Sequence, residues 1–305
     1  MPRVRWLTFA ALVVVVGAAS ADDSPDFWAH WGDGLAEMNS YALTYNRYGE
    51  NRQGKTIAIF VTETFSDKKR VKADSGQVPK DDELPVLKLN LVKDFQTGVY
   101  DYKLLTSVFA AVDPRADRAA MAPVKVSFSS QEWCGHVYEE RIFRAEQITR
   151  TVRSYFLDES IDHETTAWPD DGITEDELPI LVRELRGERL KPGGKMTVPY
   201  LMSAERARMT HITPAWTTAV IGKSAAPETV DTPAGKFQAV LWSATPKGQD
   251  AWRFWVDTAY PHKLVRWERV DGEIAVLTGS TRMPYWKLHG EGDEKHLKEF
   301  GPAAN

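Results

Sequence analysis

The segment 131–136 (QEWCGH) holds the side chains whose types and spacing most suggest catalytic chemistry. A cysteine close to a histidine can form a thiolate–imidazolium pair, which is the basis of nucleophilic catalysis by cysteine. On a strand, however, Cys134 and His136 would share one face with side chains about 7 Å apart, too far for a hydrogen bond. We therefore expect a buried, inert cysteine, and an enzyme that uses Cys134 and His136 is the less favoured alternative.

The pattern of ligating side chains indicates no metal centre. His163-Glu164 is not followed by a second histidine at the spacing of a zinc site, and no other histidine pair has a ligand spacing. The segment 170–172 (DDG) lacks the alternating oxygen ligands and the distal glutamate of an EF-hand loop. The sequence predicts no metal, no cofactor and no catalytic residue, although a metal site assembled from distant residues stays open.

A set of aromatic side chains is the second candidate site. Trp252 and Phe254 alternate along one strand, Trp255 points to the other face of it, and Trp242 and Trp267 belong to neighbouring strands. Large apolar side chains on the concave side of a wide sheet can enclose a lipid or an acyl chain. The sequence predicts these five residues as a ligand-binding set, and simple core packing is the open alternative.

These aromatic residues need a sheet to position them, and its clearest part is a hairpin. Residues 263–270 and 273–280 are strand-like and are separated only by Asp271-Gly272. Such a pair favours a two-residue type I′ turn, which needs positive φ at both positions. The turn sets the register, and we expect Trp267 to face Val276.

Strand-like segments make up most of the remaining chain. Residues 124–156 predict two long strands, and the glycine-containing segment 48–54 predicts a hairpin loop. Further strands are expected at 41–47, 56–63, 86–92, 100–112, 195–202, 208–221, 237–244 and 252–257.

Between residues 158 and 194 the character of the chain changes. Residues 158–177 are rich in acidic side chains, which predicts a polar loop. Helical spacing of the apolar residues 178, 181, 182 and 185 then predicts an amphipathic helix that covers the sheet. Asp176 is the expected cap of this helix, with Pro179 in its first turn.

The composition excludes several classes of protein. The 305 residues are 43% hydrophobic and 27% charged, which is typical of globular proteins. The net charge of −5 offers no basic surface for nucleic acid. Cys134 is the only cysteine, so an internal disulfide is impossible.

The N-terminal residues have the pattern of an export signal. Arg3 and Arg5 precede a short apolar run at 6–17, and Ala19-Ser20-Ala21 is a small-residue cleavage motif. The apolar run is shorter than the roughly 20 residues that cross a bilayer, and no later segment is long enough to do so. We expect a signal peptide at 1–21 and a mature protein in the periplasm or outside the cell.

The C-terminal third resembles a known group of domains. The motifs GKFQA at 235–239, WRFWVD at 252–257 and PHKLV at 261–265 are similar to uncharacterised exported bacterial domains with a lipoprotein-carrier-like β fold. That resemblance implies a curved, partly closed antiparallel sheet with helices over its mouth, and many relatives bind lipid or lipoprotein acyl chains. Segments of the N-terminal part, such as DFQTG at 94–98, resemble exported proteins without an assigned activity, so no catalytic residue is implied.

The sequence as a whole predicts a mainly β protein: a large curved antiparallel sheet, or half-barrel, with a few short covering helices. The expected segments are a signal peptide (1–21), an N-terminal β region (22–157), an acidic loop and helix connection (158–194), a C-terminal antiparallel β region (195–290) and a polar tail (291–305). The expected function is non-catalytic binding of a lipid or acyl chain in the bacterial envelope. A module that binds another envelope protein is the alternative.

Overall fold

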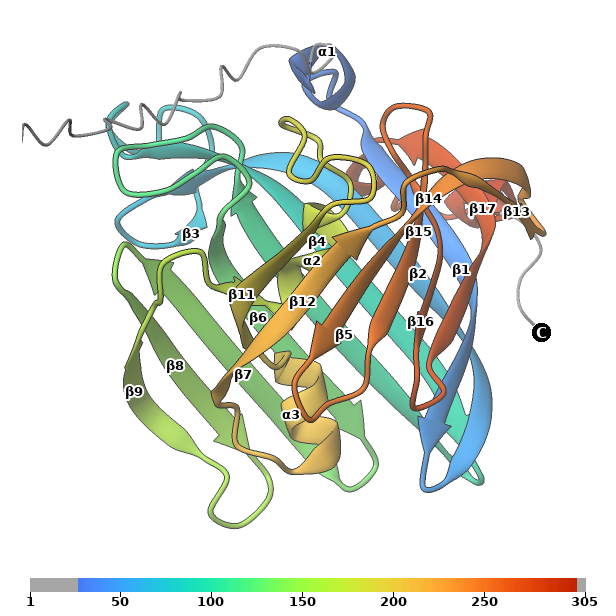
Figure 1. Cartoon of the computed structure of the whole chain (residues 1–305), viewed down its shortest axis with the longest axis horizontal. Coiled ribbons are helices and arrows are strands. Elements are labelled where there is room, and N and C mark those ends of the chain that lie inside the picture. Colours follow the sequence, from blue (N-terminus) through green and yellow to red (C-terminus); the bar gives the residue numbers. More distant parts are fainter. Residues whose placement is uncertain (1–26, 301–305) are drawn as a thin grey trace, which may run out of the picture.

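Strands dominate the structure of the chain, a computed structural model that describes residues 27–300 (Figure 1). The predicted signal peptide lies outside these residues, and so does the end of the predicted polar tail. The expected fold class is confirmed, because one large curved sheet carries only a few short helices. In the described part of the chain, none of the helices is long and apolar enough to cross a membrane.

The first wall of the sheet is built from strands that follow one another along the chain. Their bounds are β1 Ala36–Arg47, β2 Glu50–Ser66, β3 Val71–Lys72, β4 Glu83–Thr97, β5 Tyr100–Ala111, β6 Pro123–Glu132, β7 Gly135–Arg144, β8 Gln147–Ser154 and β9 Ile161–Ala167. Each pairs antiparallel with the next, except that the short β3 pairs only with the last two residues of β2, and β2 pairs with β4 along its length. The wall ends at β9, which pairs with β8.

The second wall contains the C-terminal strands. Their bounds are β10 Ile173–Thr174, β11 Lys195–Leu201, β12 Trp216–Lys223, β13 Glu228–Thr232, β14 Gly235–Pro246, β15 Trp252–Asp257, β16 Leu264–Arg269 and β17 Ile274–Met283. Strand β1 joins the walls, because it pairs with β2 on one side and with β17 on the other. Both β regions therefore belong to one sheet, in which β10 and β11 pair in parallel.

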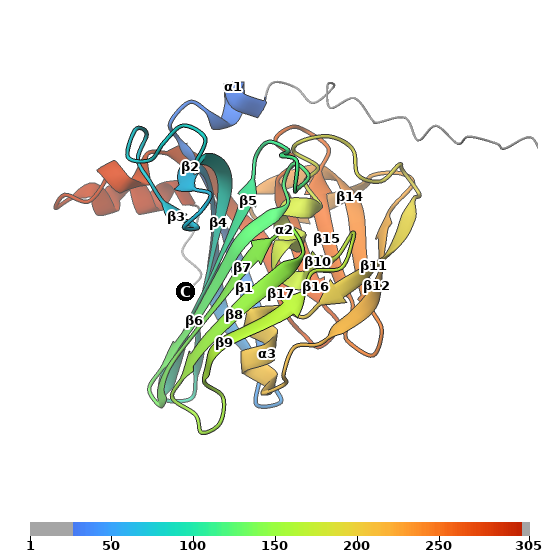
Figure 2. The same ribbon diagram turned by 90° about the vertical axis from the view of Figure 1, so that its left-hand side faces the viewer.

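Short helices complete the fold. Their bounds are α1 Phe27–Trp31, η1 Glu175–Glu177, α2 Leu178–Leu181, α3 Ala204–Thr210, η2 Tyr285–Lys287 and η3 Asp293–Phe300. Figure 2 shows α2 and α3 between the two walls, where they cover the concave face of the sheet. The predicted amphipathic helix is thus only one turn long, although all four of its spaced apolar residues are buried.

Two turns differ from the expected ones. The β1–β2 loop is shorter, because Tyr48 and Gly49 both have positive φ (58° and 76°) and form a two-residue turn. The β16–β17 loop is longer, because Gly272 N–H bonds to Arg269 O and only Gly272 has positive φ there. The predicted type I′ turn is therefore wrong: a three-residue loop ending in glycine shifts the register, and Trp267 faces Ala275.

Two predicted strand segments are divided in the structure. Residues 124–156 hold three strands instead of two, because Trp133 and Cys134 form the turn between β6 and β7. The segment 208–221 begins inside α3, and β12 starts only at Trp216. Ser203 explains this helix, since its hydroxyl accepts the backbone N–H of Arg206 and caps the first turn.

Inward-facing side chains of both walls and the short helices share one hydrophobic core. Phe60 and Leu89 contribute from the first wall, Ile221 and Trp242 from the second, and Leu178 from α2. The strands thus bury one face of the sheet around the segment 173–210, which carries part of the polar groups described next.

Candidate functional site

A single 3₁₀ turn places three consecutive carboxylates inside the protein. Glu175, Asp176 and Glu177 of η1 are all buried, so the predicted polar loop is wrong for this part of the acidic stretch. The parallel pairing of β10 with β11 holds the turn inside the curve of the sheet. Glu175 and Asp176 line an interior cavity, whereas Glu177 lines a separate groove.

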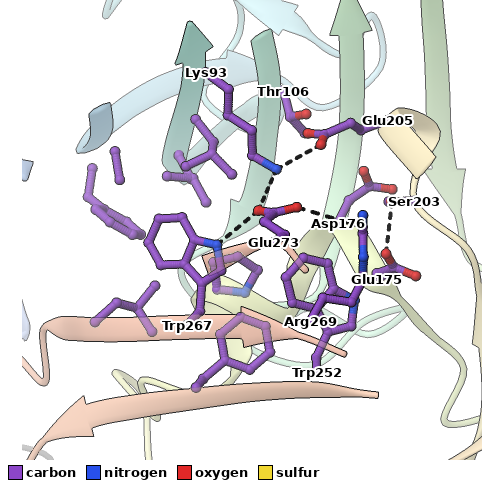
Figure 3. A pocket seen from close by; sticks show the side chains of 17 residues that line it. Lys93, Thr106, Glu175, Asp176, Ser203, Glu205, Trp252, Trp267, Arg269 and Glu273 are labelled. Atoms are coloured by element: carbon purple, nitrogen blue, oxygen red, sulfur yellow. Dashed lines mark hydrogen bonds and ion pairs between the residues drawn. The ribbon is translucent and has the colours of Figure 1, made fainter. Parts of the chain in front are cut away.

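The interior cavity lies between an apolar wall and a charged wall (Figure 3). Trp252, Phe254 and Trp267 form much of the apolar wall. Lys93 and Glu205 belong to the charged side. The volume is about 50 Å³, the space of one or two water molecules. In this conformation the interior does not hold an acyl chain.

Lys93 is the centre of the charged wall. Its Nζ donates to Glu205 Oε1 at 2.7 Å and to Glu273 Oε1 at 2.8 Å, and all three side chains are buried. Tyr45 donates its hydroxyl to Glu205 Oε1, and Trp267 Nε1 donates to Glu273 Oε1, both at 3.0 Å. Burial alone would lower the pKa of Lys93, but the two carboxylates outweigh it and raise that pKa above its ordinary value.

Asp176 connects η1 to α3 and to the first wall. Its carboxylate accepts the backbone N–H of Ala204 at 3.2 Å and forms an ion pair with Arg141 Nη1, also at 3.2 Å. Burial raises the pKa of Asp176 to about 7 against the effect of Arg141. The predicted role as cap of the helix at residue 178 is wrong, since Asp176 binds the first turn of α3 instead.

A larger groove opens beside α2. Its volume is about 520 Å³, within the usual range for a small-molecule site. It lies among the β5–β6 loop, the β7–β8 turn, the segment between β9 and β10, and α2 with the residues that follow it. The apolar side chains in its lining include Phe143, Trp168, Ile180, Leu181 and Leu185.

Glu177 is the buried acidic side chain of this groove. Its carboxylate accepts the hydroxyl of Thr174 at 3.2 Å, and among the described residues it forms no ion pair. Burial raises the pKa of Glu177 to about 8, and Arg189, the strongest opposing charge, is exposed to solvent. Glu177 thus shares an environment with the apolar floor of the groove.

The variant Glu177→Gln is expected to change how stability depends on pH. The raised pKa means that the native state keeps a proton which the unfolded chain loses above the ordinary value of 4.5. This contribution to stability is complete below about pH 4.5 and is lost as the pH rises to about 8, by up to about 1.4 kcal/mol per pH unit. Urea unfolding at several pH values in this window should show the variant gaining stability relative to the natural protein. Parallel pH curves for the two proteins would contradict the raised pKa.

The five aromatic residues predicted as a ligand-binding set are divided among three places. Trp252, Phe254 and Trp267 line the interior cavity. Trp242 is buried in the core away from the cavity lining, with Lys223 Nζ 5.3 Å from its ring centroid. Trp255 lies on the other face of β15, where its Nε1 donates to Glu228. Their role in binding stays a prediction.

Cys134 and His136 are not arranged as a catalytic pair. Cys134 lies in the β6–β7 turn and is exposed, so the expectation of a buried cysteine is wrong. His136 is on β7, opposite Gln131, and no hydrogen bond between it and Cys134 is present within residues 27–300. Gly135 between them is closely approached by the ring of Tyr155, which leaves no room for a Cβ atom. The turn is thus shaped by packing.

The sequence patterns did not predict the charged wall of the cavity, although the position of one of its residues, Lys93, indicates a buried charge. Lys93 occupies the same strand parity as Leu87, Leu89 and Leu91, whose face of β4 turns inward. A lysine at such a position indicates a buried charge that needs a partner. Its partner Glu205 comes from α3, in the stretch between the predicted strands 195–202 and 208–221 where no helix was expected, so no spacing rule could connect the two.

Metal-ligating side chains do not gather in the described residues. No group of three or more histidine, cysteine, aspartate or glutamate side chains there could hold a metal ion. The buried carboxylates Glu273 and Asp176 instead pair with Lys93 and Arg141, whose cationic groups lie where a metal ion would have to bind.

Comparisons with known proteins concern only the fold. No protein-family model matches the sequence, and no curated protein is similar to it. Among solved structures, the chain is similar to the crystal structure of a β-barrel-like protein of the domain of unknown function DUF1849 from Brucella abortus. The sequence identity is 11%, the TM-score is 0.44, and the match covers 82% of this chain and 97% of that chain. At this identity the likeness says nothing about function.

Proposed function

We propose that the chain is an exported envelope protein that binds a hydrophobic or amphiphilic ligand, such as a lipid or an acyl chain, without catalysing a reaction. The observation that carries the proposal is the groove of about 520 Å³ with apolar side chains in its lining. The pattern of the first 21 residues supports the location. The interior cavity beside the aromatic strands is about ten times smaller, so we place the ligand in the groove beside α2 instead.

Filling the groove with a side chain is expected to abolish ligand binding. Ala120 lines the groove and is half-buried, so Ala120→Trp places a bulky ring in the ligand's space. Displacement of a fluorescent naphthylamine probe by alkyl ligands should show affinity reduced by at least about tenfold, the loss of roughly 1.4 kcal/mol of contact. Ala116→Trp is the matched control, because Ala116 lies on the same loop, is exposed and does not line the groove. Equal affinity of both variants would contradict the proposed site.

A second candidate function is docking to another envelope protein. Four turns at one end of the sheet, the lower end in Figure 1, carry exposed apolar side chains: Tyr48, Val99, Trp133 and Leu157. Their exposed fractions are 58%, 80%, 72% and 88%, which is high for such residues. Photo-crosslinking from position 133 in intact cells should capture a discrete partner if this function is correct. Crosslinks that are no more specific than those from the exposed Lys236, in the β13–β14 hairpin, would exclude it.

A further inference from the structure

The charge balance of the groove sets Glu177 apart from the other buried carboxylates. Six of these form an ion pair within 4 Å: Glu37, Glu139, Glu175, Asp176, Glu205 and Glu273. Asp82 instead accepts hydrogen bonds from the hydroxyl of Ser66 and from the backbone N–H of Lys68. Glu177 has the hydroxyl of Thr174 as its side-chain donor and, among the described residues, no cation within 4 Å.

The charged side chains around the groove are mostly neutralised by partners of their own. Arg118 pairs with Asp67 and Asp117, and Arg186 pairs with Asp113. Further acids of the lining are also paired, Glu184 with Lys223 and Glu188 with Lys191. Arg144 donates to the backbone carbonyl of Lys68. The cations that remain at the rim to compensate Glu177 are Arg144 and Arg189, and both are exposed to solvent.

An uncompensated carboxylate in an apolar environment has a high free energy when ionised. A cation brought by a ligand removes this penalty and adds a charge-assisted hydrogen bond. The groove also offers Trp168 and Phe143, whose aromatic rings contact each other at 5.1 Å between centroids. Such rings suit hydrocarbon, and their faces also attract ammonium groups.

We propose that the ligand of the groove is an amphiphile with an ammonium group at its polar end, which pairs with Glu177, while its hydrocarbon part lies along Phe143, Trp168, Ile180 and Leu181. The inference rests on the proposed function, because it names the chemistry of the ligand for the same groove. Charge complementarity selects this ligand class. An ammonium head pairs with the ionised form of Glu177, and the proton that burial keeps on this side chain near neutral pH is released to solvent on binding. An anionic head is repelled by the ionised form, and a neutral head leaves that form without a cation.

The test compares three alkyl ligands of equal length that differ only in the head: dodecylamine, dodecanol and dodecanoate. Each ligand is titrated against the natural protein without its predicted signal peptide at neutral pH, and displacement of the bound naphthylamine probe is measured. We expect dodecylamine to bind at least about tenfold more tightly than dodecanol, and dodecanoate to bind most weakly. In Glu177→Gln the preference for the amine should fall below about threefold, with the affinity for dodecanol unchanged.

The control variant is Asp171→Asn, which removes an exposed carboxylate from the same lining. Its residue has φ 55°, a conformation that asparagine also tolerates, so the backbone should be preserved. We expect this variant to keep the full preference for the amine. Urea unfolding at neutral pH verifies that both variants fold. We expect the profile of Asp171→Asn to match that of the natural protein and Glu177→Gln to be equally or more stable.

The outcomes separate the inference from the proposed function. If dodecanol and dodecylamine bind equally to the natural protein, the ammonium inference is overturned while the groove remains a hydrophobic site. If Glu177→Gln keeps the preference for the amine, or Asp171→Asn loses it, Glu177 is not the recognising group. If no alkyl ligand displaces the probe at any accessible concentration, the proposed function itself fails.

Discussion

Replacing Lys93 by methionine is expected to lower the free energy of unfolding by about 3–5 kcal/mol. The ammonium group of Lys93 lies between Glu205 and Glu273, at 2.7 and 2.8 Å from their carboxylate oxygens. Methionine fills a similar volume, so the expected loss comes from charge and not from a cavity: Glu205 is left buried without a cation, and Glu273 keeps only Arg269, at 3.7 Å. Urea unfolding followed by far-UV circular dichroism would measure it.

Two further variants test whether charge is the cause of the Lys93 effect. Lys103→Met removes an ion pair with Asp94 from the neighbouring strand, but that pair is exposed and should contribute less than about 1 kcal/mol. Adding Glu205→Gln and Glu273→Gln to Lys93→Met neutralises both carboxylates that lost Lys93 and should recover part of the lost stability, since Arg269 keeps Asp271 as its partner. A loss near 1 kcal/mol for Lys93→Met, or no recovery in the triple variant, would show that charge pairing in the charged wall of the cavity contributes little to the free energy of unfolding.

Arg183→Met is expected to destabilise the protein by a similar amount, about 3–5 kcal/mol. Arg183 follows α2 and is fully buried, with Nη2 at 3.0 Å from Glu37 Oε2 and 2.8 Å from the carbonyl of Pro261. The guanidinium also lies 4.2 Å from the ring centroid of Phe60. One side chain thus joins α2 to β1, β2 and the β15–β16 loop, and its loss leaves Glu37 buried and unpaired.

The matched control for Arg183 is Arg186→Met, three residues further along the chain. Arg186 pairs with Asp113 where both side chains are partly exposed, so its removal should cost less than about 1 kcal/mol. Glu37→Gln in the Arg183→Met background should restore part of the stability, since a neutral amide then replaces the unpaired carboxylate. Thermal unfolding in which Arg183→Met and Arg186→Met behave alike would contradict the role of Arg183.

Local sequence patterns were sufficient for the fold class and for much of the strand content. Alternation of apolar side chains identifies β4, β5, β14 and β15, because the period of two follows from backbone geometry alone. The same patterns did not settle turn lengths. Asp271-Gly272 favours a two-residue turn in isolation, but the fold uses a three-residue loop, which brings Trp267 opposite Ala275 and keeps both on the buried face.

The candidate site shows the limit of such patterns more clearly. Lys93 and Glu205 are 112 positions apart, and Lys93 and Glu273 are 180 apart, so their contact depends on how the two walls curve toward each other. The acidic residues of 158–177 predicted an exposed loop, because carboxylates normally lie on the surface. Only the parallel pairing of β10 with β11 carries Glu175, Asp176 and Glu177 to the inside.

The sequence by itself determined that this chain is a mainly β protein whose strands turn back on one another, since strand propensity and turn chemistry act between residues close in the chain. Tertiary structure decided that the concave side is filled by helices and paired charges, and that a groove of about 520 Å³ lies beside α2 next to Glu177. The physical reason is that burial and charge pairing are properties of three-dimensional neighbourhoods: a carboxylate has the same local pattern whether the sheet closes over it or leaves it in water.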